Sequence, residues 1–177
     1  MRIFVGCSSS EDVDLIYLKS AKKLGKMIAE NGHSLIFGSS DKGMMGELYR
    51  GVKENGGKVI SVFPKQYSGF LTKVESDEII ETETATDQLK YLVNNGDVTI
   101  IMPGSYGALA ELSTSIQNKK LGEHNKPIFI ININGYFNDI LKAFEKFYND
   151  RFDLCDRNKL YTVVNEPDEI LNYLNNN

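Results

Sequence analysis

Short apolar runs alternate along the chain with longer segments in which apolar residues recur every three or four positions. The runs are rich in Ile, Val and Phe, as in RIFV and DVTIIM. Continuous apolar runs of this length are typical of strands that are covered on both faces. We expect strands at residues 2–5, 33–37, 58–63, 77–81, 97–102, 126–132 and 161–164.

The segments between these runs have the period of an amphipathic helix. In the first of them Leu18, Leu24 and Ile28 fall on one face, and Gly32 follows as a helix C-terminal glycine. Strands that alternate with helices predict a single α/β domain over residues 1–177, built as a doubly wound parallel sheet of about six or seven strands with helices on both faces. Helices are expected at residues 14–31, 42–54, 86–95, 106–120, 136–148 and 167–174.

The composition is that of an ordinary globular protein, with 41% hydrophobic and 25% charged residues and a formal net charge of −4. This balance argues against a nucleic acid or a membrane surface as partner. The two cysteines, Cys7 and Cys155, lie far apart, so the sequence predicts no disulfide framework and favours a reducing, cytoplasmic compartment. No metal site and no cofactor are expected, because the few His and Cys residues do not cluster.

The loops that follow the first, second and fifth expected strands are the first candidates for a binding site, because ligands of doubly wound sheets bind beyond the carboxyl ends of the strands. The first loop reads GCSSS. The hydroxyl groups of Ser8 and Ser9 can donate hydrogen bonds to a phosphate. The alternative is that Ser9 or Ser10 only caps the helix that follows.

The second loop, GSSDKGMMG, holds more glycines than one turn needs. Gly43 and Gly46 lie early in a helix, where each costs about 1 kcal/mol relative to alanine. They therefore predict that a ligand or another backbone segment passes close by. Gly38 and Ser39 are candidate phosphate contacts, and Lys42 is either an anion contact or an ordinary surface lysine. The spacing is not that of a P-loop.

The third loop, in IIMPGSYGALAEL, ends a strand at Pro103 and opens a helix. The backbone N–H groups of residues 105–109 would face an anion with the helix dipole behind them. Two interpretations of Glu111 stay open: it complements the dipole of an exposed helix start, or it acts on a sugar C–N bond in a cleft. The candidate phosphate-binding residues of this loop are Gly104, Ser105, Tyr106, Gly107 and Ala108.

Four stretches together resemble the LOG (Lonely Guy) family, whose members are often labelled possible lysine decarboxylases: VGCSSS, FGSSDKGMMGEL, MPGSYGALAEL and KPIFIININGYF. The resemblance extends over residues 2–170. It implies a Rossmann-like fold, a homodimer and a phosphoribohydrolase. Such an enzyme splits a nucleoside 5′-monophosphate, for example a cytokinin riboside monophosphate or AMP, into free base and ribose 5-phosphate.

The chain departs from the family pattern at one important position. The family motif P-G-G-x-G-T-x-x-E ends on Glu111, and its motif M-H-E-R-K falls on residues 85–89 when counted back from Asp97. The resemblance thus implies that Glu111 and position 88 form the catalytic pair, but the family's Arg is Gln88 here and its Lys is Leu89. Gln88 can form hydrogen bonds but carries no charge.

Two functions therefore remain as alternatives. The first is a LOG-like hydrolase that uses Glu111 on a nucleoside 5′-monophosphate; a variant of it is a hydrolase for a modified or deoxy-nucleotide with a rearranged set of catalytic residues. The second is a nucleotide-binding sensor or carrier without this activity, which the loss of the cation at Gln88 favours. A lysine decarboxylase is not favoured, because the chain is short for a pyridoxal-phosphate enzyme and no Schiff-base lysine stands out.

Overall fold

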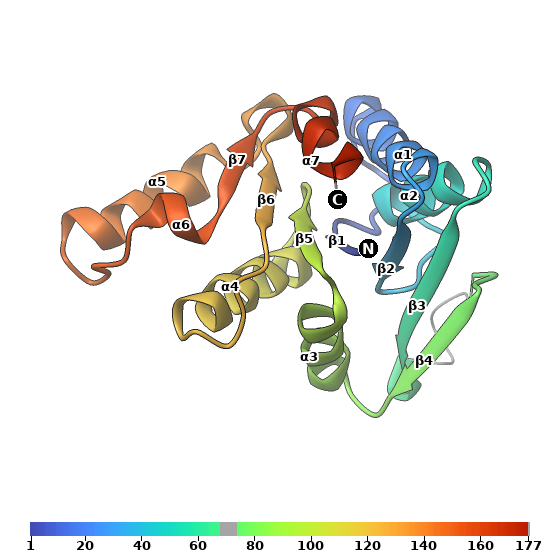
Figure 1. Ribbon diagram of the computed structural model, residues 1–177, viewed down its shortest axis with the longest axis horizontal. Helices are drawn as coiled ribbons and strands as arrows, with labels where there is room; N and C mark the ends of the chain where they lie inside the picture. The colour runs from blue at the N-terminus through green and yellow to red at the C-terminus, as the bar shows by residue number, and fades with distance from the viewer. Residues whose placement is uncertain (68–73, 177) are drawn as a thin grey trace.

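A computed structural model of the chain describes residues 1–67 and 74–176. Its centre is a seven-stranded sheet in the order β4-β3-β2-β1-β5-β6-β7, and every neighbouring pair is parallel (Figure 1). The doubly wound α/β prediction is confirmed. The strands are β1 (Arg2–Gly6), β2 (Ser34–Phe37), β3 (Lys58–Pro64), β4 (Glu78–Thr82), β5 (Val98–Ile101), β6 (Ile128–Ile131) and β7 (Thr162–Val164).

All six predicted helices are found, and the one at 106–120 has the predicted bounds. The last prediction, 167–174, is divided between the 3-10 helix η3 (Pro167–Ile170) and a short α-helix. A four-residue helix, α6, had not been predicted, because so short a segment carries no helical period. The helices are α1 (Leu15–Glu30), α2 (Gly43–Lys53), α3 (Ala85–Asn95), α4 (Tyr106–Lys120), α5 (Asn138–Asn149), α6 (Arg157–Leu160) and α7 (Leu171–Asn175), with shorter 3-10 turns η1 (Lys65–Tyr67) and η2 (Ile133–Gly135).

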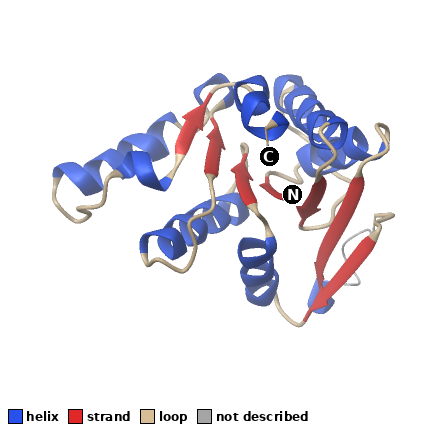
Figure 2. Cartoon of the chain, in the orientation of Figure 1, coloured by secondary structure: helices blue, strands red, loops and turns tan. Residues whose placement is uncertain are grey.

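Helices cover both faces of the sheet, with α1, α2 and α7 on one side and α3 and α4 on the other (Figure 2). Successive strand residues point to opposite faces. In β1, Ile3 and Val5 accordingly pack with α1 and α2, whereas Phe4 packs with Leu92 and Val93 of α3. The central strand β1 is therefore apolar on both faces, which explains its continuous apolar run, whereas the edge strands β4 and β7 leave part of their residues exposed.

The strand order places a switch point at the centre of the sheet. From β1 the chain runs outward through β2, β3 and β4, and it then crosses back to place β5 on the other side of β1. The connections after β1 and β5 leave in opposite directions, which opens a crevice at the carboxyl ends of these strands. No helix in the described part of the chain is long and apolar enough to span a membrane.

Candidate ligand-binding site

A cavity of about 410 Å³ lies at the carboxyl ends of the central strands. This volume is in the range of small-molecule sites, roughly 300–1,000 Å³. The three loops that the sequence singled out form most of its wall, and β3, η1 and α3 complete it. The lining residues are Cys7, Ser8, Ser9, Ser10, Gly38, Ser39, Ser40, Met45, Pro64, Tyr67, Gln88, Ser105, Gly107, Ala108 and Glu111.

Backbone contacts join the three loops at Ser8. Its N–H donates to the carbonyl of Pro103 (3.1 Å), and its carbonyl accepts from the N–H of Met45 (3.1 Å). The start of α2 also passes so close to the first loop that a Cβ on Gly43 would lie 2.2 Å from the carbonyl oxygen of Ser10. Of the two explanations predicted for Gly43, the structure gives the neighbouring backbone. The alternative role of Ser9 or Ser10 as a helix cap is wrong, because α1 begins only at Leu15.

Glu111 lies on the second turn of α4 and reaches over the end of β1. A Cβ on Gly6 would lie 2.1 Å from its Oε2, so only a glycine leaves room for this carboxyl group. No described residue forms a hydrogen bond or ion pair with it. Desolvation in the partly buried site raises the pKa of Glu111 to about 8. The group is therefore mostly protonated at neutral pH, unlike an exposed glutamate that complements a helix dipole.

Cys7 lies beside Glu111 in the wall of the cavity. Burial, and secondarily the negative charge of Glu111, raises the pKa of the Cys7 thiol far above its usual range. Since the thiolate is the nucleophilic form of cysteine, Cys7 acts here as a small, neutral part of the wall.

None of the described lining residues is Lys, Arg or His. Lys42 lies outside the cavity and forms an ion pair with Glu11 (3.2 Å). Lys90, which follows the family's Lys position, is exposed and does not line the cavity either. An anionic group would therefore depend on neutral donors, which are the hydroxyl groups of six serines and the N–H groups in the first turn of α4. Within residues 105–109, the Leu109 N–H is already bonded to the Ser105 carbonyl (3.0 Å).

Gln88 connects two strand ends at the wall of the cavity. Its Nε2 donates to the carbonyl of Val62 in β3 (2.7 Å) and to that of Gly38 after β2 (3.3 Å). The position at which the family resemblance places a catalytic cation is therefore occupied by a neutral amide with both partners in the backbone.

Most of the residues predicted for the site line this cavity, and four do not. Tyr106 is 88% exposed and Lys42 is paired elsewhere. Gly43 and Gly104 serve close backbone packing, since a Cβ on Gly104 would lie 2.6 Å from that of Ala108. The lining residues that the prediction did not include are Cys7, Ser10, Ser40, Met45, Pro64 and Tyr67. Of these, Pro64 ends β3. It could have been predicted if the rule that ligands bind beyond the carboxyl ends of strands had also been applied to the third strand.

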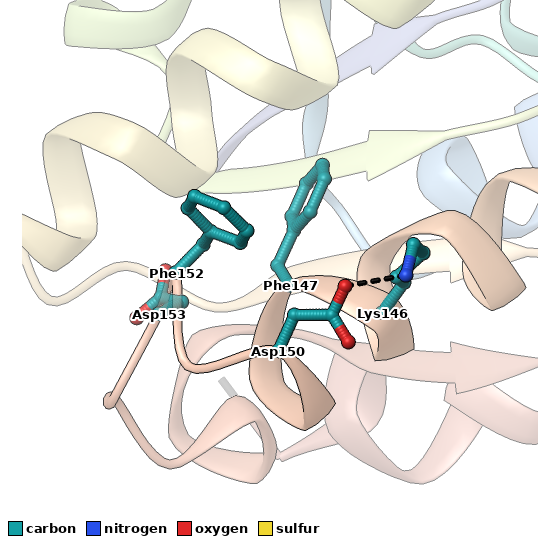
Figure 3. Close-up of a pocket in the computed structure, with 5 residues that line it drawn as sticks. All are labelled: Lys146, Phe147, Asp150, Phe152 and Asp153. Atoms are coloured by element: carbon teal, nitrogen blue, oxygen red, sulfur yellow. Dashed lines mark hydrogen bonds and ion pairs between the residues drawn. The ribbon is translucent and has the colours of Figure 1, made fainter.

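A second cavity of about 500 Å³ lies at the end of α5, far along the chain from the strand-end loops. Figure 3 shows that its main features are the rings of Phe147 and Phe152 and the ion pair between Lys146 and Asp150. It lacks the convergent neutral donors of the strand-end cavity. We therefore assign the candidate site to the strand-end cavity. In the described residues, no group of three or more His, Cys, Asp or Glu side chains is placed to hold a metal ion.

The chain is similar to solved structures over almost its whole length. A molybdenum cofactor carrier protein from Chlamydomonas reinhardtii has a TM-score of 0.73 and 22% identity over 99% of this chain and 96% of that one. A molybdenum cofactor binding protein from Rippkaea orientalis has the same score and identity, over 99% and 95%. At this identity the likeness establishes the shared Rossmann-like fold.

Several curated proteins have a higher sequence identity to this chain than these solved structures do. Two probable cytokinin riboside 5′-monophosphate phosphoribohydrolases of Oryza sativa subsp. japonica are 28% and 30% identical, over 98% and 97% of this chain and 71% and 75% of theirs. A cytokinin riboside 5′-monophosphate phosphoribohydrolase of Arabidopsis thaliana is 27% identical over 98% of this chain and 76% of its own. The family model described as possible lysine decarboxylase matches residues 45–174. The chain therefore belongs to the LOG family, the group to which that description is attached.

Proposed function

We propose that this protein binds a nucleoside 5′-monophosphate in the strand-end cavity and cleaves its N-glycosidic bond, which releases the free base and ribose 5-phosphate. The observation that carries the proposal is the carboxyl group of Glu111, which lies in the cavity with a pKa of about 8. The names of the sequence relatives point to the same reaction.

Glu111 supplies a proton where the reaction needs one. Cleavage of the C–N bond leaves negative charge on the base and builds positive charge on the sugar. A protonated Glu111 donates its proton to the departing base, and the carboxylate that remains stabilises the sugar cation. Water then adds to the sugar carbon and returns a proton to Glu111. In this scheme a single group performs both tasks, so the reaction does not depend on a cation at position 88.

The phosphate would lie at the start of α4. Ser105 is the N-cap of this helix and its hydroxyl caps no helical N–H, so both its oxygen and its O–H are available to a ligand. Ser8 and Ser9 also line the cavity, and the Ser8 N–H donates to the carbonyl of Pro103 in the loop before α4. Backbone N–H groups with a helix dipole behind them bind phosphate without a positively charged side chain.

The direct test is incubation with AMP, GMP, CMP and UMP, followed by chromatography for free base and ribose 5-phosphate. We expect turnover in the wild type and a loss of about 100-fold or more in Glu111→Gln, because the amide keeps the shape but transfers no proton. Glu123→Gln, on the exposed loop after α4, is the matched control. Binding without release of base over several hours would refute the hydrolase.

The absence of a cation among the described lining residues favours a second candidate, a nucleotide-binding sensor or carrier. Gln88 lacks the charge that would stabilise a departing base, and the same fold occurs in proteins named as a molybdenum cofactor carrier and binding protein. This candidate predicts that the ligand is recovered unchanged after stoichiometric binding, whereas the hydrolase predicts that it is consumed.

We further infer that two copies of the chain associate through the surface around the end of α5. The apolar face of α5 is covered only in part: Ile140, Leu141 and Phe144 pack against the core, whereas Phe147 is 48% exposed. Phe152 and Leu154, in the loop after it, are 83% and 85% exposed. Such a surface is larger and more apolar than scattered single residues, and it is typical of an interaction site.

A further inference from the structure

The amide of Gln88 is fixed in one orientation. Both partners of its nitrogen, the carbonyls of Val62 and Gly38, can only accept hydrogen bonds. The NH₂ group must therefore face these carbonyls, and the alternative amide orientation would bring three oxygens together. The Gln88 oxygen, Oε1, is consequently directed away from both strands.

No described residue donates to Gln88 Oε1. The atom is also not among the described buried polar atoms that lack a partner, so it is open to the cavity or to solvent. Gln88 thus presents an acceptor and no donor to a ligand. Its family counterpart, an arginine, would present the opposite, since a guanidinium group only donates.

The position of Gln88 indicates which part of the ligand it meets. Along the sheet edge the order is β3, β2, β1 and β5, and Gln88 bonds β3 and the end of β2, so two to three strand spacings, about 10–14 Å, separate it from the end of β5, where α4 starts. Met45, Pro64 and Tyr67 line the cavity together with Gln88, as do Ser39 and Ser40, which directly follow Gly38. The Cβ position of Gly38 is 3.1 Å from the Met45 methyl group and 3.3 Å from Gln88 Nε2, so these two side chains flank the same strand end.

From these observations we propose that Gln88 determines base specificity: Oε1 accepts a hydrogen bond from an N–H group on the edge of the ligand's base, while Met45, Pro64 and Tyr67 contact the ring. The ligand class is then a nucleotide whose base carries an amino or ring N–H donor. This inference rests on the proposed function only in placing the phosphate at α4. The inference concerns ligand binding alone and holds whether or not the ligand is then cleaved.

The experiment compares the binding of AMP, 2′-deoxy-AMP and purine riboside 5′-monophosphate, which lacks the amino group and any ring N–H on that edge. Calorimetry is carried out on the full chain with Glu111→Gln, so that no ligand is consumed. We expect purine riboside monophosphate to bind about tenfold more weakly than AMP. The 2′-deoxy compound should bind like AMP, because the donor is on the base and not on the sugar.

Two substitutions test whether Gln88 causes the preference for AMP over purine riboside monophosphate. Gln88→Arg keeps donors for the carbonyls of Val62 and Gly38 but removes the acceptor, so the ratio between AMP and purine riboside monophosphate should fall to about one. Gln88→Met removes donors and acceptor together and should lose the ratio as well. The positive charge of Gln88→Arg can strengthen phosphate binding, but it does so for both ligands and leaves the ratio of their affinities unchanged. If Gln88→Met fails to fold, Gln88→Arg still provides the test.

Equal binding of AMP and purine riboside 5′-monophosphate by the Gln88 protein would overturn the inference, as would a preference that survives in Gln88→Arg. A preference that follows the 2′-hydroxyl group would overturn it too, since the donor would then be on the sugar. The proposed hydrolase reaction is tested separately from these binding results. A protein that prefers AMP but releases no adenine in the wild type would refute the reaction and retain the specificity.

Discussion

Glu111 makes the protein sensitive to pH because its carboxyl group ionises in the unfolded chain near its ordinary pKa of 4.5, and in the folded chain near 8. Between these values the folded state binds more protons, so the free energy of unfolding falls as the pH rises. The stabilisation is complete below pH 4.5 and is lost as the pH passes 8. The slope within this window is at most about 1.4 kcal/mol per pH unit.

Urea unfolding at pH 5, 7 and 9 checks this expectation. Glu111→Gln removes the titrating group and should flatten the decline between pH 5 and 9, whereas Glu123→Gln should retain it. If the wild type and Glu111→Gln share one pH dependence, then the carboxyl group is not desolvated as described. In the proposed reaction the turnover should stay nearly constant between pH 5 and 7 and fall as the pH rises through about 8, because ionised Glu111 has no proton to donate.

At Gln88 an added positive charge should accelerate the proposed reaction, although the reaction does not require it. In Gln88→Arg the guanidinium group can keep both backbone contacts and adds the positive charge that the family places there. We expect base release to rise by roughly 10- to 100-fold, in line with the value of a preorganised charged donor. Single-turnover assays with AMP measure this directly. A variant that folds normally but is no faster would show that the charge at this position does not limit the reaction.

At the scale of elements, the site depends on how tightly the start of α2 meets the loop after β1. Gly43 has a φ of +54°, and an added Cβ would meet the Ser10 carbonyl. Gly43→Ala should therefore lower the free energy of unfolding by about 1–3 kcal/mol. Gly107→Ala is the matched control at the start of α4, because a Cβ there would meet nothing within 4 Å. Equal effects of the two substitutions on urea unfolding would contradict this account.

The elements themselves were largely predictable, because apolar period and strand-end position are local properties of the sequence. The start of helix α4 shows this clearly, since the Pro-Gly turn at residues 103–104 ends the strand and the helix begins two residues later, at Tyr106. Local pattern could not show that Glu111 lies against Gly6, or that Gln88 bonds the ends of β2 and β3. These contacts join residues that are distant in the sequence, and only the strand order brings them together.

For the molecule as a whole, two surfaces differ in their chemistry. The strand-end cavity is rich in hydroxyl groups and also holds Glu111 and Gln88, whereas the surface at the end of α5 exposes Phe147, Phe152 and Leu154. Burial of apolar rings is the main driving force of stable association. A partner that covers this surface would leave the mouth of the strand-end cavity free, so association and ligand binding should be separable by mutation.

Light scattering coupled to size-exclusion chromatography tests the association. We expect the mass of a dimer for the wild type at micromolar concentration and the mass of a monomer for Phe152→Asp, because a carboxylate in an apolar interface must be desolvated without a partner. Ile79→Asp is the control: Ile79 is 47% exposed on β4, at the opposite edge of the sheet. A monomeric wild type, or a dimer that persists in Phe152→Asp, would assign this surface no role in self-association. Since the cavity lies elsewhere, the monomeric variant should still bind AMP with wild-type affinity.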